Sequence, residues 1–498
     1  MKKAIAILLA AGLLASATAC SGGNGGNGGA SGSPAASPSG GASASTPASG
    51  DPVTITIVDK DLPADDPLLK GIEEGMKAEG KNVKLQLVPV QSGTYSEKLG
   101  LLLQSGNIPD LIYFQGGDYQ FAVTQGILED LTPYIAQSTY VKASMNPYNQ
   151  KRTQNYPYLV WLSPTSSKVP VVRQDWLDAA ASGKELLVNP TPDNYYAFFK
   201  EMKEKKGAAY GYTTAGTLDE LDATFGQAFG LTATWIKGDD GKYAFGKTTT
   251  FEKQKLEYYA KLYKDGLLDP EFLTKKWDTK EKAFYDGQAA VIAGTQGKTI
   301  DIYNTKMTSQ NGAGAKIVPL PPAKGVAQGY TPIDVSKESR GFAIGKTSKH
   351  KDLAFAVLEY LASPKGQMLD KLGVEGTQYE ITNDQIKLTD KFAEWYPRFV
   401  ESTVNFKPEF PFDPATPYLS EPAAKSLDMM AAMSSEDNAF IIPAELAAKW
   451  DACTALYNEF AANMVTGKKT AADWDSFVKD WNAAGGKDLT DYANQTLK

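Results

Sequence analysis

From residue 53 onward, short runs of β-branched apolar residues alternate with longer stretches in which apolar residues recur every three or four positions. The first part of the pattern has apolar runs at 53–58, 83–90 and 111–114, separated by helix-period stretches at 67–79 and 95–105. Apolar runs of four to eight residues predict strands, and the wider spacing predicts amphipathic helices. This βαβαβ order predicts right-handed crossovers and a doubly wound, mainly parallel sheet.

The stretch Gly106 to Tyr119, GNIPDLIYFQGGDY, places polar and aromatic residues directly after a strand. Its continuous apolar run is entered through a Pro-Asp pair and ended by two glycines, which is typical of a strand buried on both faces. Gln115, Asp118 and Tyr119 follow the carboxyl end of this strand, and Asp59 follows the first strand in the same way. Open α/β sheets bind ligands at such ends, so we expect these four residues to contact a ligand.

The segment 156–164, YPYLVWLSP, is aromatic, bounded by prolines and extended, which predicts a crossing to a second lobe near Trp161. A later segment around Tyr330 predicts a hinge, and a strand beginning at Arg340 predicts a return to the first lobe. The expected lobes are residues 51–162 with 330–375, and residues 163–329 with 376–498, the end of which is rich in helices.

The second lobe contains a further predicted strand end. The run 289–294 predicts a buried strand, and Gln296 follows it before another helix begins. Trp277 opens the preceding helix, and Trp235 begins a predicted hairpin with an Asp-Gly turn. Flat rings such as Tyr119, Trp235 and Trp277 suit the apolar faces of sugars, but burial in the core is an equal alternative for each ring.

The first 50 residues predict that the protein is exported from the cytoplasm and tethered to a membrane. Lys2-Lys3, an apolar run at 4–15 and a small-residue stretch predict a signal peptide at residues 1–19, which is too short to span a membrane. Residues 21–50 contain only Gly, Ser, Ala, Pro, Thr and Asn and predict a disordered tether. Cys20 follows Ala-Thr-Ala and resembles the acylated cysteine of a bacterial lipobox, so residues 20–50 are expected to be a lipid-anchored tether. A plain signal peptide cut near Ala19 is the alternative.

Composition narrows the possible functions. A length of 498 residues predicts two domains, and a net charge of -7 without a basic stripe argues against nucleic acid as a partner. The chain has one histidine and two cysteines, which disfavours a zinc site and a Ser-His or Cys-His catalytic group. We expect His350 to be solvated and Cys453 to be a small buried apolar residue.

Several motifs resemble one family. GxxPDL at 106–111 and GxLxDLTxYI at 126–135 resemble the extracellular solute-binding proteins of ABC importers, and more narrowly the large lipoprotein branch of family 1 that takes up oligosaccharides. RxDWL at 173–177, LYxxGLxDPEF at 262–272 and GxEGxxY at 373–379 match the same family. The resemblance covers nearly all of the chain after the tether.

The resemblance implies an α/β, two-lobed periplasmic-binding-protein-like fold of class II, each lobe a doubly wound, mainly parallel sheet. It implies a monomeric, non-enzymatic protein without a cofactor. Such a protein is lipid-anchored to the outer face of the bacterial cell membrane, captures an oligosaccharide between its lobes and delivers it to an ABC permease. Arg173 stands where the family presents a ligand-facing arginine, with a structural pair to Asp175 or Asp178 as the alternative. The family's calcium loop is not expected, because residues 204–212 lack the required carboxylates.

The candidate ligand-binding residues follow strands or lie at the expected crossings, hinge and hairpin. They are Asp59, Gln115, Asp118, Tyr119, Trp161, Arg173, Trp235, Trp277, Gln296, Tyr330 and Arg340. Two alternative functions remain: a secreted glycoside hydrolase, which needs two carboxylates across a cleft, and a receptor for a peptide or another non-sugar solute.

Overall fold

The computed structural model describes most of the chain beyond the predicted tether. The described residues are 50–60, 62–89, 95–115, 122–123, 125–144, 157–160, 168–331, 340–398, 406–435, 437–438, 440 and 442–497. The predicted signal peptide, Cys20, Asp118, Tyr119 and Trp161 lie outside them. Within the described part of the chain, no helix combines the length and apolar character needed to cross a bilayer.

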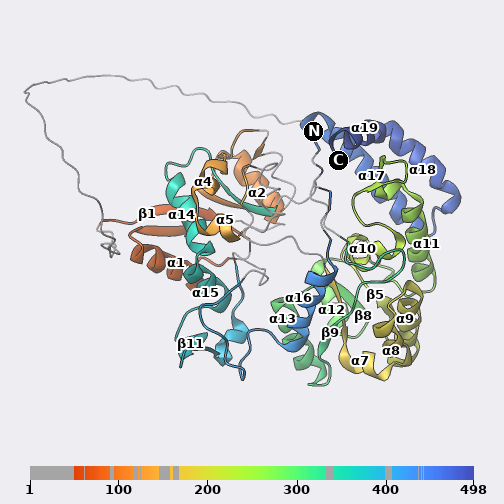
Figure 1. Cartoon of the computed structure of the whole chain (residues 1–498), viewed down its shortest axis with the longest axis horizontal. Helices are drawn as coiled ribbons and strands as arrows, with labels where there is room; N and C mark the ends of the chain where they lie inside the picture. The colour runs from red at the N-terminus through yellow and green to blue at the C-terminus, as the bar shows by residue number, and fades with distance from the viewer. Residues whose placement is uncertain are drawn as a thin grey trace, which may run out of the picture. The chain divides into compact units, whose positions relative to one another are not determined.

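The first sheet has the strand order β10-β3-β1-β2 (Figure 1). Its strands are β1 (Val53–Val58), β2 (Val83–Leu87), β3 (Leu111–Gln115) and β10 (Arg340–Ile344). β1 runs parallel to β2 and β3, and β10 returns antiparallel to β3. The sheet is therefore mainly parallel, as the βαβαβ order predicts.

Helices cover both faces of this sheet. Ile55 and Ile57 of β1 pack in one buried cluster, whereas Ile112 and Phe114 of β3 pack in another on the opposite face, as strand alternation requires. The helices associated with this sheet are α1 (Pro67–Ala78), α2 (Tyr95–Gln104), α4 (Thr132–Gln137), α5 (Tyr140–Ser144), α14 (Lys351–Ala362) and α15 (Pro364–Leu372). α1 begins after Asp66, whose side chain accepts a hydrogen bond of 3.0 Å from the Leu68 amide and so caps the helix.

The core of the first sheet extends past residue 375, where the sequence places a lobe boundary. A hairpin of β11 (Tyr379–Thr382) and β12 (Gln385–Leu388) buries Ile386 in the same cluster as α1 and α14, and Tyr418 packs there too. The next helix, α16 (Glu421–Met433), contacts a strand of the second sheet instead. The chain therefore changes cores near residue 419, because the apolar side of the hairpin needs this core to be buried.

The second sheet has the order β5-β8-β4-β9. Its strands are β4 (Val169–Arg173), β5 (Tyr210–Tyr212), β8 (Ala289–Thr295) and β9 (Ile317–Pro319). β5 and β8 are parallel, but β4 is antiparallel to both β8 and β9, so this sheet is mixed and not mainly parallel. The chain enters β4 at the edge where β8 ends, with Val169 opposite Thr295, and must therefore run in the opposite direction.

The second sheet carries the larger set of helices, in yellow to blue in Figure 1. Those before residue 312 are α7 (Gln174–Ala179), α8 (Ala181–Val188), α9 (Pro192–Lys206), α10 (Asp219–Phe225), α11 (Thr250–Lys264), α12 (Trp277–Tyr285) and α13 (Lys298–Asn311). A hairpin of β6 (Trp235–Lys237) and β7 (Tyr243–Phe245) joins α17 (Ala444–Val465), α18 (Trp474–Trp481) and α19 (Lys487–Thr496) in the same core.

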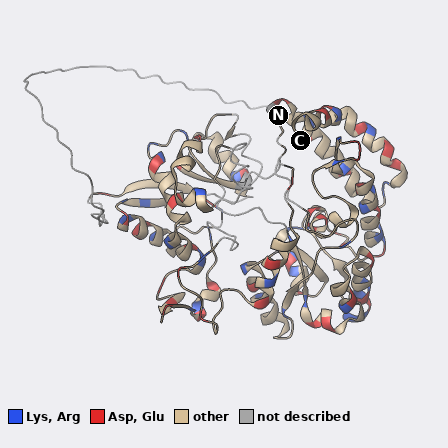
Figure 2. Ribbon diagram, viewed as in Figure 1, with Lys and Arg blue, Asp and Glu red and all other residues tan. Residues whose placement is uncertain are grey.

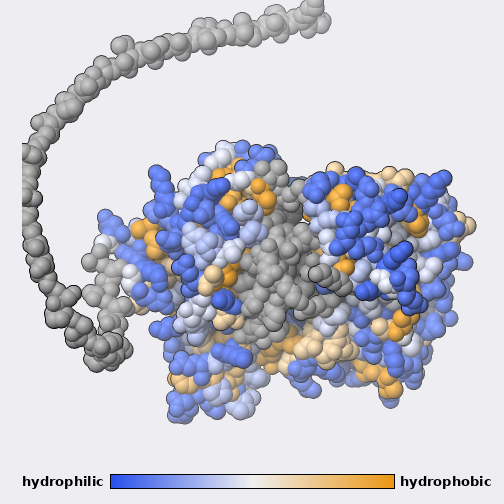
Figure 3. Space-filling model, turned by 45° about the horizontal axis from the view of Figure 1, so that its top comes forward, coloured by the Kyte–Doolittle hydropathy of each residue, from blue (hydrophilic) through white to orange (hydrophobic). Residues whose placement is uncertain are grey.

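Charged residues of both signs are interspersed over the helices of both sheets (Figure 2). On the face in Figure 3, hydrophilic residues cover most of the described surface, and hydrophobic residues form only scattered patches.

Candidate ligand-binding site at the edge of the second sheet

Three strands of the second sheet bring their ends to one edge. β5 and β8 end there, and β4 begins there, so Lys168, Thr213 and Gln296 lie at neighbouring strand ends. Two helices also begin near this edge, α10 at Asp219 and α12 at Trp277. The edge therefore collects polar and aromatic side chains from five segments between residues 168 and 296.

Trp277 presents an exposed ring at this edge. Trp277 is 42% exposed, which is unusual for tryptophan. Its ring lies against Gly294 of β8. A Cβ added at Gly294 would lie 2.5 Å from the Trp277 ring, and the φ of Gly294 is +104°, so only glycine lets the ring approach the strand. The indole N–H donates to Glu281, which also accepts from the Tyr303 hydroxyl. These contacts hold the ring in place while part of it faces solvent.

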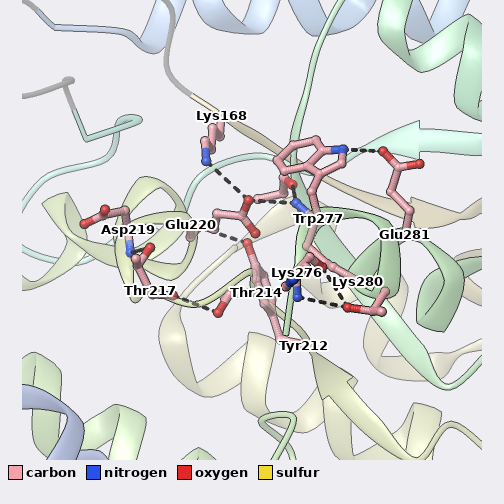
Figure 4. A network of polar contacts seen from close by, with 12 residues as sticks. Lys168, Tyr212, Thr214, Thr217, Asp219, Glu220, Lys276, Trp277, Lys280 and Glu281 are labelled. Carbon is pink, nitrogen blue, oxygen red and sulfur yellow. Dashed lines mark hydrogen bonds and ion pairs between the residues drawn. The ribbon is translucent and has the colours of Figure 1, made fainter. Parts of the chain in front are cut away.

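A buried carboxylate joins two lysines beside this ring (Figure 4). Glu220 Oε1 accepts from Lys280 Nζ at 2.7 Å and from Lys168 Nζ at 3.2 Å. Lys280 Nζ also donates to the Ala293 carbonyl at 3.0 Å and lies 3.4 Å from the centroid of the Trp277 ring. Burial lowers the pKa of Lys280 to about 8, although Glu220 acts in the opposite direction.

Two buried oxygen atoms at this edge have no hydrogen-bond partner among the described residues. They are Oε2 of Glu220 and Oε1 of Gln296. A buried acceptor without a donor costs about 1–3 kcal/mol, so native proteins rarely leave one unsatisfied outside functional sites. Hydroxyl groups of a ligand would supply the missing donors.

The first sheet has a comparable edge. Asp59 follows β1 and is 5% exposed, and Gln115 ends β3. Arg340 begins β10 and stands opposite Gln115 in the antiparallel register. Three of the residues expected to bind ligand therefore lie at one edge of the first sheet, as Trp277 and Gln296 do at the second.

Two other residues that the sequence predicts as ligand contacts, Trp235 and Tyr330, are buried away from these edges. Trp235 is 1% exposed and packs in the core with its ring centroid 5.0 Å from that of Phe440. Tyr330 is fully buried, and its hydroxyl donates to the Leu320 carbonyl at 3.2 Å. These two rings are inaccessible to a ligand in this structure because neighbouring side chains enclose them.

Arg173 ends β4 and so lies at the opposite end of the strand from Lys168. Its guanidinium donates to both oxygens of Asp175, at 3.0 and 2.7 Å, and stacks 4.9 Å from the Trp176 ring centroid. The pair with Asp175, which the sequence offers as the structural alternative for this arginine, is therefore present.

Lys168, Glu220 and Lys280 were not among the residues predicted from the sequence. The available signal was the position of Lys280, which lies three residues after Trp277 and three before Ala283 on the buried side of α12. A lysine on the apolar face of a helix is unusual and needs a buried partner. Among the described residues, no three His, Cys, Asp or Glu side chains gather closely enough to hold a metal ion.

Comparisons with known proteins agree with this architecture. A family model described as bacterial extracellular solute-binding protein matches residues 61–368. Lipoprotein LipO of Bacillus subtilis is 25% identical over 369 residues, which cover 68% of this chain and 70% of LipO. The polygalacturonan/rhamnogalacturonan-binding protein YtcQ of the same organism is 20% identical, covering 84% of this chain and 86% of YtcQ.

Solved structures show the same fold. The alginate-binding protein AlgQ2 superimposes with a TM-score of 0.61 at 19% identity, covering 90% of this chain and 98% of AlgQ2. The N-glycan transport solute-binding protein NgtS of Streptococcus pneumoniae gives a TM-score of 0.62 at 15% identity, covering 89% and 96%. The chain therefore has the two-lobed periplasmic-binding-protein-like fold that the motifs predict.

Proposed function

The chain belongs to the bacterial extracellular solute-binding protein family, and from this premise we propose that it captures an extracellular oligosaccharide for an ABC importer. The ligand is held between the two lobes, which close on it by a hinge motion, and is then delivered to the permease. Several relatives and structural neighbours are named for binding glycans, which supports a sugar as the ligand.

The edge of the second sheet carries this proposal. An exposed Trp277 ring offers a stacking surface for the apolar face of a pyranose, while Glu220 and Gln296 each offer a buried oxygen without a donor. Oligosaccharides combine apolar ring faces with many hydroxyl donors, so their chemistry complements both features. The opposing contacts come from the first lobe. The residues proposed to contact the sugar are Asp59, Gln115, Asp118, Tyr119, Trp161, Trp277, Gln296 and Arg340.

We further propose that the protein is a lipoprotein attached to the outer face of the cell membrane through Cys20. The lipobox-like sequence before this cysteine and a relative named as a lipoprotein support the anchor. Mass spectrometry of protein extracted from membranes tests this step, because acylation adds the mass of the lipid to a chain that begins at Cys20. A chain that begins after Ala19 without added mass contradicts it.

The hydrogen bonds of the two carboxylates at this edge disfavour a role in glycoside hydrolysis. Glycoside hydrolysis needs one carboxylic acid to donate a proton and a second carboxylate across the bond. Here Glu220 accepts from two lysines, and Glu281 accepts from Trp277 and Tyr303, so both are committed to holding other side chains. We therefore propose binding without chemistry.

Thermal unfolding in the presence of oligosaccharides, amino acids and peptides tests the proposed function. A ligand present at one hundred times its dissociation constant adds about 2.7 kcal/mol to the free energy of unfolding. We expect such a shift with at least one oligosaccharide and no new reducing ends after incubation. A shift with peptides alone contradicts the sugar assignment, and new reducing ends would indicate a hydrolase.

A further inference from the structure

The two lysines beside Trp277 outnumber the carboxylate that they share. Lys280 is fully buried and directs its ammonium to Glu220, to a backbone carbonyl and to the indole ring. Lys168 donates to the same Glu220 oxygen at 3.2 Å, and its side chain is 41% exposed. Lys168 can therefore donate further hydrogen bonds to a group that arrives from solvent, because an ammonium carries three N–H donors.

Further charged side chains of the described residues lie near these two lysines. Glu281 lies 3.7 Å from Lys306, so that pair is internally balanced. Asp219, at the start of α10, lies 3.8 Å from Lys247, which also lies 4.0 Å from Asp222. Lys276 and Asp278, on either side of Trp277, are both exposed and of opposite sign. Among the described charged groups that contact Glu220, two lysines therefore share one carboxylate, and Lys168 is the lysine that solvent reaches.

Lys168 lies close enough to the Trp277 ring to contact a substituent of a sugar stacked on that ring. Its Nζ lies 5.6 Å from the centroid of the Trp277 ring. A pyranose in contact with the indole has its ring carbons about 3.5–4 Å from the indole carbons. A carboxylate on such a sugar is the group that we expect to accept from this ammonium, at the roughly 2.7–2.9 Å typical of a charge-assisted hydrogen bond.

We propose that this site selects an anionic oligosaccharide, in which uronate units carry carboxylates, and that Lys168 binds the carboxylate of the unit stacked on Trp277. This inference rests on the proposed function and names its substrate class. A neutral sugar at the same place would cover the ammonium of Lys168 without supplying a countercharge, which is unfavourable for a charge removed from water. A uronate supplies that charge and replaces the lost hydration with a strong hydrogen bond.

Calorimetric titration with matched ligands tests the substrate class. The ligands are trimers of galacturonate, mannuronate and glucuronate, each compared with its methyl ester, which keeps the sugar chain but removes the charge, together with neutral oligosaccharides. We expect at least one acid trimer to bind about tenfold or more tightly than its ester, because charge-assisted hydrogen bonds are roughly twice as strong as neutral ones. We also expect the acid to lose affinity between low and high salt, and the ester to be nearly insensitive to salt.

A variant of Lys168 and a control variant of another lysine test whether Lys168 binds the carboxylate. Lys168→Gln should weaken acid binding about fivefold or more and leave ester binding nearly unchanged. Lys242→Gln, an exposed lysine in the turn between β6 and β7, is the matched control and should leave both affinities unchanged. Thermal unfolding without ligand shows whether each variant is folded.

The outcomes separate the two proposals. Binding of a neutral oligosaccharide without binding of any acid trimer overturns the anionic assignment and leaves the importer function standing. Equal affinities for acid and ester, or an equal loss of both in Lys168→Gln, also overturn it. If no glycan of either kind binds, the proposed function itself fails.

Discussion

Trp277 and Trp235 have opposite surroundings, and exchanging each for a smaller residue tests the site. Trp277 is 42% exposed, and a tryptophan has roughly 250 Å² to bury, so about 100 Å² is open to a ligand. At about 25 cal/mol per Å², covering all of this surface contributes about 2.5 kcal/mol. Because a sugar covers only part of the ring, we expect Trp277→Ala to weaken oligosaccharide binding by about 1–2.5 kcal/mol, or roughly 5- to 70-fold in the dissociation constant.

Trp235 should respond in the opposite way. It is 1% exposed, and its ring lies against Phe245 and Phe440 in the core. Replacing a buried tryptophan by alanine costs about 3–5 kcal/mol, so the milder Trp235→Phe, expected to cost about 1–3 kcal/mol, keeps the protein folded for binding measurements. Its affinity for oligosaccharide should match that of the unaltered protein.

Urea unfolding and calorimetric titration on the same preparations separate the two effects. Trp277→Ala should weaken binding in addition to any loss of unfolding free energy, because its ring also contacts Gly294, Glu281 and Lys280, whereas Trp235→Phe should lower the unfolding free energy without weakening binding. The reasoning is refuted if Trp277→Ala keeps full affinity for a sugar that binds the unaltered protein. It is equally refuted if Trp235→Phe weakens binding without loss of stability.

Variants at three further positions test the framework that positions the site. Thr191 caps α9, so Thr191→Ala should lower the free energy of unfolding in urea by about 1 kcal/mol while Thr191→Ser retains most of it. A hydrogen bond from Lys205 and bonds from Ser182 lower the pKa of Glu201 to about 2, below the ordinary value of 4.5. The stabilisation by this carboxylate is complete above pH 4.5 and is lost toward pH 2, so the unfolding curves of Glu201→Gln and the unaltered protein should converge as the pH falls; a constant difference contradicts this. Lys255 is fully buried between two carboxylates, and Lys255→Met should cost about 3–5 kcal/mol in thermal unfolding, whereas a neutral effect would contradict its role.

The first sheet was largely predictable because its signals are local. β1 occupies the predicted residues 53–58, and α1 begins at Pro67 as its Pro and the preceding Asp66 indicate. The direction of β4 was not predictable from its own sequence, since it depends on which edge of the sheet the chain reaches first. The change of core near residue 419 depends in the same way on tertiary packing.

The site was predictable only in part. The rule that ligands bind at strand ends selected Gln296, which follows β8. The rule applies equally to every strand, so it does not rank one strand end above another. Nothing in the residue type distinguishes Trp277 from Trp235, because exposure depends on which side chains enclose the ring. Lys280 was missed for a related reason, since most helical lysines are solvated and its burial depends on Glu220, 60 residues away in the sequence.

The two fully buried lysines of the second lobe show how the site differs from the framework. Lys255 binds Asp222 at 2.6 Å and Glu252 at 2.9 Å, and its pKa is raised because these carboxylates outweigh burial. Lys280 has a single carboxylate partner, which it shares with Lys168, and its pKa falls to about 8. Lys255 thus has two carboxylate partners, whereas Lys280 and Lys168 share one, so a ligand carboxylate can supply a second at the edge of the second sheet.

Because Lys280 shares its one carboxylate partner with Lys168, we expect Lys280 to take up protons when an anionic sugar binds. The charged groups that face Lys280 are Glu220, Lys168 and Glu281, and burial makes about half of the Lys280 side chains neutral at pH 8. A carboxylate arriving at Lys168 stabilises the ammonium form of Lys280, so binding at pH 8 should take up as much as about half a proton. At pH 6.5, where Lys280 is already protonated, uptake should vanish. Calorimetry in buffers of different ionisation enthalpy measures the uptake, and proton release at pH 8 would show that the ligand buries Lys280 without balancing its charge.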